Sequence, residues 1–166
     1  MRDIRFSEDD QARIRSASGR QRYNVLGAIN PLTLQFFRVC NTQYINSASV
    51  CELLRQIASA GISTPISLVL DNARYQRCEL VQSLARQLNI ELLFLPSYSP
   101  NLNLIERLWK FVKKQALYNH HHTNFQDFQQ RIDSCVDQIS ATHGVALTRL
   151  LNTKFQTYEQ ATVLAA

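Results

Sequence analysis

The fold is decided by one stretch of the chain, ISLVLDNARYQRCELVQSLARQLNIELLFLP (66–96). Its first five residues, 66–70, form a short apolar run that is typical of a buried strand. Residues 90–95 form a second apolar run, and Pro96 ends it. Between the two runs, apolar residues recur at the spacing of one helix face: Leu80, Val81, Leu84 and Leu88. A strand, a helix and a second strand in this order predict a parallel βαβ unit.

The upstream residues predict a hairpin and a helix. Residues 23–29 and 32–39 have strand patterns, and the Asn30-Pro31 pair supplies the turn between them. A helix follows the hairpin along the chain, and Ser47 or Ser49 can cap it. Its apolar residues recur at the spacing of one helix face: Val50, Leu53, Leu54, Ile57 and Ala58.

The downstream residues predict helices alone. One covers about residues 102–117, Thr123 or Asn124 starts another, and leucines near Leu147 suggest a short last helix. We therefore expect an α/β fold, a mixed sheet flanked by helices on both faces. The expected organisation is a basic, irregular segment (1–22), one core domain (23–155) and a tail (156–166).

Composition limits the class of protein. The chain has 166 residues, 45% of them apolar, and a net charge of +5. This balance suits a globular domain that binds a polyanion such as DNA, although the charge could also serve solubility alone. The four cysteines form no C-x-x-C pair, which favours free thiols over a zinc site. No segment resembles a signal peptide or a membrane span, so we expect a soluble, cytoplasmic protein.

Two acidic residues stand where chemistry is expected. Asp71 directly follows the apolar run 66–70, and functional groups gather at the carboxyl ends of parallel strands. Glu106 lies in the first turns of the helix that follows a proline-rich loop. Oxygen ligands of this kind suit Mg²⁺ or Mn²⁺, and a pair of such ions can catalyse phosphodiester cleavage. The alternatives are a helix N-cap for Asp71 and an exposed Glu106–Lys110 ion pair.

The residues around these carboxylates resemble a known family. LVLDNARYQRC (68–78) and ELLFLPSYSPNLNLIERLWKFVKK (91–114) closely resemble the DDE domain of IS630-type transposases, in the Tc1/mariner superfamily. The resemblance implies an RNase H-like fold and metal-dependent DNA strand cleavage and transfer with Mg²⁺ or Mn²⁺. It makes Asp71 and Glu106 the second and third of three acidic metal ligands. Thirty-four residues (72–105) separate them, which is similar to the spacing in the superfamily.

The first acidic ligand of that family has no counterpart in its usual setting. SGRQRYNVLGAIN (18–30) resembles the family's second-strand region, yet no F-x-D-A-x-H-F-like segment precedes it. We therefore expect an N-terminally truncated core that lacks its first strand and is inactive alone. The alternative is a non-catalytic remnant for DNA binding or subunit interaction. A third reading, a regulatory domain with Asp71 as phosphoacceptor, gives no role to residues 96–109.

The implied partner is double-stranded DNA, with a homodimer or a complementing N-terminal fragment as a possible protein partner and no membrane. Basic residues on the helix that carries Glu106 are the expected phosphate contacts: Arg107, Lys110, Lys113 and Lys114. Further contacts are expected from Arg13, Arg15, Arg20 and Arg22. Tyr98 could stack on a base, and residues 120–122 could bind a metal, but packing and a solvated turn are the simpler interpretations.

Overall fold

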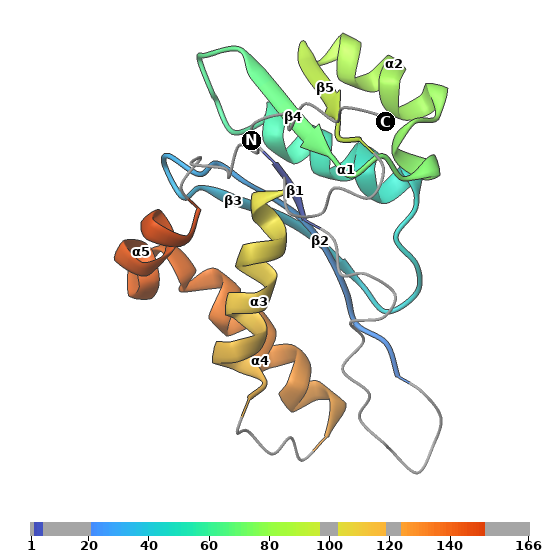
Figure 1. The fold of residues 1–166 in the computed structure, drawn as a ribbon. Helices are drawn as coiled ribbons and strands as arrows, with labels where there is room; N and C mark the ends of the chain where they lie inside the picture. Colours follow the sequence, from blue (N-terminus) through green and yellow to red (C-terminus); the bar gives the residue numbers. More distant parts are fainter. Residues whose placement is uncertain (1, 5–20, 97–102, 119–123, 152–166) are drawn as a thin grey trace, which may run out of the picture.

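The computed structural model describes residues 2–4, 21–96, 103–118 and 124–151, which form one mixed sheet with helices on both faces (Figure 1). The strands are β1 (Arg2–Ile4), β2 (Asn24–Ile29), β3 (Phe36–Asn41), β4 (Ile66–Leu70) and β5 (Ile90–Phe94). The α-helices are α1 (Ser47–Ala58), α2 (Glu79–Gln87), α3 (Leu104–Ala116), α4 (Phe125–Asp137) and α5 (Ile139–Leu150), and a short 3-10 helix, η2, covers Arg74–Gln76. The α/β fold predicted from the sequence is confirmed.

The sheet has the strand order β3-β2-β1-β4-β5. β3, β2 and β1 pair antiparallel, whereas β1, β4 and β5 pair parallel. The predicted βαβ unit is therefore present as β4-α2-β5. Since β1 and β4 run in the same direction, their carboxyl ends meet at one edge of the sheet.

The expectation that the first strand is missing was wrong. A three-residue strand, β1, occupies the centre of the sheet, where Arg2 stands opposite both Ile29 of β2 and Val69 of β4. The segment shows no apolar run because it is short and carries charges, so periodicity could not reveal it. Its backbone is paired on both sides, which is enough to place it in the sheet. Residues 5–20 lie outside the described part, and the domain boundaries stay a prediction.

The hairpin strand after Pro31 begins later than predicted. The side-chain Oδ1 of Asn30 accepts hydrogen bonds from the N–H groups of Leu32 (2.9 Å) and Thr33 (3.3 Å). The Leu34 N–H donates to the Asn30 carbonyl oxygen (2.8 Å), and Leu34 itself has a φ of 60°. These bonds hold residues 30–35 in a turn, so that β3 starts at Phe36 and not at Leu32.

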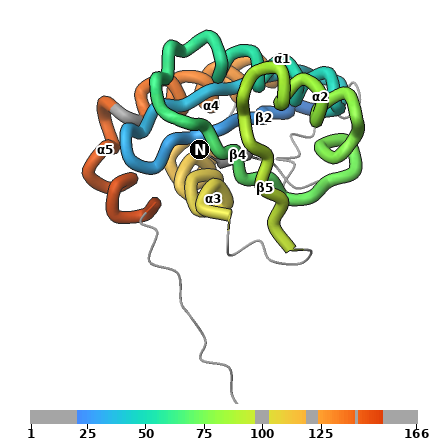
Figure 2. Tube along the Cα trace, turned by 90° about the horizontal axis from the view of Figure 1, so that it is seen from above, coloured from blue at the N-terminus to red at the C-terminus, as the bar shows by residue number. Residues whose placement is uncertain are grey.

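Side chains of the sheet alternate between two apolar clusters. Leu26, Ala28, Leu68 and Leu70 are buried with α1 and α2, on what we name the α1 face. On the opposite side of the sheet, which we name the α3 face, α3, α4 and α5 pack against β2 and form a second cluster. Its large members are Val25, Ile29, Leu108, Trp109, Phe128 and Leu147. In the view from above, α1 and α3 lie on opposite sides of the strands (Figure 2).

Several helix boundaries differ slightly from the sequence patterns. Asn46, and not Ser47 or Ser49, is the N-cap of α1, while Ser49 completes the capping box from inside the helix. In α2 the inward residues are Val81 and Ala85, whereas Leu80 is 59% exposed. Asn124 is confirmed as the N-cap of α4. In the part of the chain that the structure describes, no helix has the length and apolar character needed to cross a membrane.

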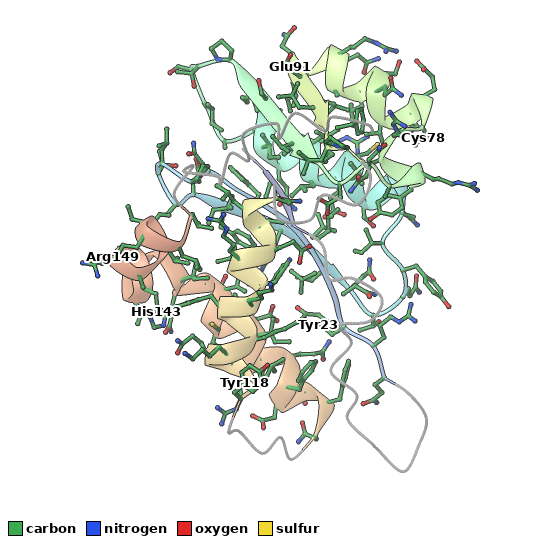
Figure 3. All side chains as sticks on the ribbon, in the orientation of Figure 1. Tyr23, Cys78, Glu91, Tyr118, His143 and Arg149 are labelled. Atoms are coloured by element: carbon green, nitrogen blue, oxygen red, sulfur yellow. The ribbon has the colours of Figure 1, made fainter. Side chains whose placement is uncertain are left out.

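Polar contacts fix α4 to the antiparallel half of the sheet. Tyr23, labelled in Figure 3, donates its hydroxyl hydrogen to Asp133 Oδ1 (2.7 Å). Arg38 of β3 donates to the Asp133 carbonyl oxygen (3.2 Å) and to Asp137 Oδ2 (3.1 Å). Burial, followed by hydrogen bonding to Cys40 and Asp133, raises the pKa of Tyr23 above its ordinary value of 10.0. These contacts join α4 to β3 and to the residue that precedes β2.

The cysteines are free, as expected from their spacing. Cys51 is buried in α1, and burial raises the pKa of its thiol. The remaining three are half-buried: Cys40, Cys78 and Cys135.

Candidate metal and DNA-binding site

Asp71 stands at the carboxyl end of β4, as the sequence predicts. Successive strand residues point to opposite faces, and Leu68 and Leu70 belong to the α1 face. Asp71 therefore belongs to the α3 face, where its Oδ1 accepts a hydrogen bond from Nδ2 of Asn103. The capping alternative for Asp71 is wrong, since Cys78 is the N-cap residue of α2.

Asn103 connects this aspartate to α3. It is fully buried (0% exposed) and is the N-cap of α3, with its Oδ1 accepting from the Ile105 N–H (3.3 Å). Asn103 lies within the stretch 91–114 that resembles the transposase family, but no role was predicted for it. Its position three residues before an acidic residue is the signal of a helix N-cap and could have identified it.

Glu106 lies in the first turn of α3, one turn from Asn103. Its N–H donates to the Asn103 carbonyl oxygen (3.2 Å), and its side chain is half-buried. The chain of contacts Asp71–Asn103–Glu106 thus runs from the end of β4 to the start of α3. The structure brings both predicted ligands to the α3 face at one edge of the sheet.

The loop after Asp71 is held by its own contacts. Asn72 has a φ of 74°, a left-handed conformation that Asn tolerates better than most residues. Its Oδ1 is buried and has no hydrogen-bond partner among the described residues. The Ala73 N–H donates to Oε1 of Gln76 (3.0 Å), and Gln76 is fully buried. The backbone on either side of Asp71 is therefore shaped by both the strand and this turn.

The basic residues of α3 fall into two groups. Arg107 is half-buried and donates through Nη1 to the Leu150 carbonyl oxygen (3.2 Å), which joins α3 to α5. Lys110 and Lys114 are exposed, and Lys113 is half-buried, towards the end of α3 that Tyr118 marks in Figure 3. The exposed lysines suit phosphate contacts better than Arg107, whose guanidinium has a structural contact.

A second basic group lies where β2 begins. The Arg22 guanidinium carbon sits 5.1 Å from the ring centroid of Tyr44, a cation–π contact, and Tyr44 is 71% exposed. Three other arginines predicted to contact DNA lie outside the described residues: Arg13, Arg15 and Arg20. Tyr98 and residues 120–122 also lie outside them.

The predicted donor set consists of two carboxylates. Within the described ranges, no group of three or more His, Cys, Asp or Glu side chains could hold a metal ion. Asp71 and Glu106 supply hard oxygen donors, which fit Mg²⁺ or Mn²⁺ and do not fit a soft metal. A pair of carboxylates would suit an ion that is bound through few protein ligands and keeps several waters.

Comparison with known proteins identifies the family. Residues 1–129 match the family model described as DDE superfamily endonuclease, which covers more than half of the chain. The chain therefore belongs to the DDE superfamily endonuclease family. No curated protein matches the sequence.

Solved structures show the same fold. The catalytic domain of Mos1 mariner transposase is similar with a TM-score of 0.62 and 15% identity, over 90% of this chain and 74% of that one. The HTLV-2 integrase catalytic core domain, solved in complex with magnesium in a dimeric form, is similar with a TM-score of 0.53 and 12% identity, over 86% of each chain. The Mos1 strand transfer complex matches with a TM-score of 0.61 and 17% identity, over 84% of this chain and 41% of that one. These likenesses confirm the RNase H-like fold.

Proposed function

We propose that the chain is the catalytic core of an IS630-type transposase, and that Asp71 and Glu106 bind a divalent metal ion for DNA strand cleavage and transfer. One observation carries the proposal. Buried Asn103 ties Asp71 to the first turn of α3, so the two carboxylates belong to one rigid unit. The IS630 assignment rests on the Pro96–Trp109 motif and on the family to which the chain belongs.

The proposed metal is Mg²⁺ or Mn²⁺. The Mos1 catalytic domain has been solved with Mg and with Mn, which supports the choice for a chain of the same fold. A divalent ion would activate a water or a 3′-hydroxyl for attack and would stabilise the leaving oxygen. Asp71 and Glu106 would hold the ion, and the rigid ends of β4 and α3 would fix their separation.

The proposed partner is double-stranded DNA in the cytoplasm. Exposed lysines towards the end of α3 would contact phosphates, which gives binding that weakens with salt and depends little on sequence. A second copy of the chain, or a complementing N-terminal fragment, is the proposed protein partner. The Mos1 strand transfer complex and the dimeric HTLV-2 integrase core support this, as relatives in fold that occur in assemblies.

We further propose that the chain alone does not complete strand cleavage. Two carboxylates hold one ion adequately but leave a second ion without enough ligands. The central strand also carries an acidic residue, Asp3. Asp3 lies in charged surroundings that do not match the F-x-D-A-x-H-F-like setting of the family's first ligand, so it is not part of the proposed ligand set.

A plasmid-nicking assay with either metal tests the proposal, together with calorimetric titration of Mn²⁺. We expect Mn²⁺ binding that Glu106→Ala abolishes, and no nicking by the unaltered chain. Failure to bind Mn²⁺ would favour the alternative of a non-catalytic DNA-binding or subunit-interaction module. Nicking that Glu106→Ala removes would show that the chain is active, and its loss in Asp3→Asn would make Asp3 a third ligand.

A further inference from the structure

We propose that Asn103 is a positioning residue that sets the geometry of the metal site by holding the Asp71 carboxylate against the first turn of α3. The inference rests on the proposed function, because it assigns a role within the same site. Asn103 itself need not contact the metal. It acts through Asp71 and through the helix that carries Glu106.

The hydrogen bonds of the Asn103 side chain allow one orientation of the amide. Its Nδ2 donates to Asp71 Oδ1, and its Oδ1 accepts from the Ile105 N–H (3.3 Å). The reversed amide would place its oxygen against a carboxylate and its NH₂ against an N–H donor. Both ends of the amide are therefore specified, one by the sheet and the other by the helix.

Burial makes this link rigid. Asn103 is 0% exposed, and the next two residues, Leu104 and Ile105, are equally buried in the core of the α3 face. A bond from an amide to a carboxylate is stronger where water is excluded. The link also joins positions 32 residues apart in the chain, which no local turn connects.

A simple capping role is the competing explanation, and the chain contains a control for it. Asn124 is the N-cap of α4, and its Oδ1 accepts from the Asp127 N–H (2.8 Å). Asn124 is exposed and lies on a helix that carries none of the proposed ligands. The same substitution at the two asparagines therefore separates the capping role from the positioning role.

The test compares Asn103→Ser with Asn124→Ser in the full chain, with Mn²⁺ as the probe. Serine keeps an oxygen that can cap a helix but is too short to reach Asp71. We expect Asn103→Ser to weaken Mn²⁺ binding by about 10–100-fold, as losses of ligand-orienting partners do in metal sites. Asn124→Ser should leave the Mn²⁺ dissociation constant unchanged. Thermal unfolding without metal shows that each variant is folded at the titration temperature, and Asn103→Thr replaces Asn103→Ser if the serine variant is not.

The outcomes separate this inference from the proposed function. If the unaltered chain binds Mn²⁺, Asp71→Asn abolishes binding and Asn103→Ser does not weaken it, Asn103 is only a cap and the inference is overturned. If the unaltered chain does not bind Mn²⁺, or if Asp71→Asn binds it equally well, the proposed function fails and the inference fails with it.

Discussion

Helices α3 and α4 begin with the same local arrangement, yet only one of them belongs to the candidate site. Each has 13 residues, an asparagine N-cap and an acidic residue at the third helical position, Glu106 in α3 and Asp127 in α4. In each helix the cap side chain accepts a backbone hydrogen bond. The local sequence therefore specifies a helix start in both cases and nothing more.

The difference lies in what surrounds the cap. Asn103 is buried and its amide reaches a carboxylate at the end of β4, whereas Asn124 is exposed. The acidic residue of α4 pairs with Arg131 one turn later (3.6 Å), as on an ordinary helix surface. A common capping motif becomes part of a site only where the fold sets a second carboxylate against it.

The largest predicted contrast concerns the acidic residues themselves. Glu106→Gln should reduce Mn²⁺ affinity by more than the roughly 10–100-fold that loss of an orienting partner costs, because it removes a ligand. Asp127→Asn should leave Mn²⁺ affinity unchanged. Isothermal titration of both variants measures the contrast, and equal effects would show that Glu106 is not a ligand.

The next contrast concerns the stability that each cap provides. Asn103→Ala removes a cap worth about 1 kcal/mol and a bond to a charged group worth about 1.5–3 kcal/mol, so we expect a loss of about 2–4 kcal/mol. Asn124→Ala removes only a cap and should cost about 1 kcal/mol. Urea unfolding gives both values. Equal losses would mean that the bond to Asp71 adds no net stability.

A smaller effect is expected where α4 meets the sheet. The raised pKa of Tyr23 means that the folded protein favours the protonated phenol. The stability that the folded protein gains from this protonated phenol is complete below pH 10.0, the ordinary pKa of tyrosine in the unfolded chain. It is lost as the pH rises above that value. Tyr23→Phe should therefore be less stable than the unaltered chain at pH 8, by about 1 kcal/mol for the lost bond to Asp133.

The stability difference between the unaltered chain and Tyr23→Phe should shrink when urea unfolding is repeated above pH 10. A difference that stays constant across this range would show that the hydroxyl is not held in its protonated form by the fold.

The smallest contrast concerns DNA. Lys110→Gln and Arg131→Gln each remove one positive charge, from exposed positions on α3 and α4. If Lys110 contacts a phosphate, its loss should make the fall of log affinity with log salt less steep, by about 0.9 in the slope. The loss of Arg131 should leave the slope unchanged. Fluorescence anisotropy with a labelled duplex over a salt series measures both. Matching slopes in the two variants would remove α3 from the DNA-binding surface.

Local patterns predicted much of this fold. The apolar runs of β4 and β5 and the stripe of α3 are contiguous signals, and Trp109 is buried as its spacing indicates. β1 could not be found in this way, because three residues that include two charges contain no period. The start of β3 was misplaced because the Asn30 side chain holds the following residues in a turn.

The positions of the candidate site residues in the fold were predictable only in part. Asp71 could be recognised from the end of its strand and Glu106 from a resemblance. The bond that Asn103 makes to Asp71 crosses 32 positions and depends on how α3 docks on the sheet. Such a contact belongs to tertiary structure, and the sequence offers only the cap residue as a sign of it.

The central position of β1 has a consequence for the order of folding. β2 and β3 are close in sequence, as are β4 and β5, so each pair closes a modest loop. β1 pairs with β2 across a loop of similar size, 27 positions from Arg2 to Ile29, but it pairs with β4 across 67 positions, from Arg2 to Val69. Closing the longer loop costs roughly 1 kcal/mol more in chain entropy than closing the shorter one. The antiparallel strands β1, β2 and β3 and the parallel pair β4 and β5 can therefore form early and separately, and the pairing of β1 with β4 joins them late.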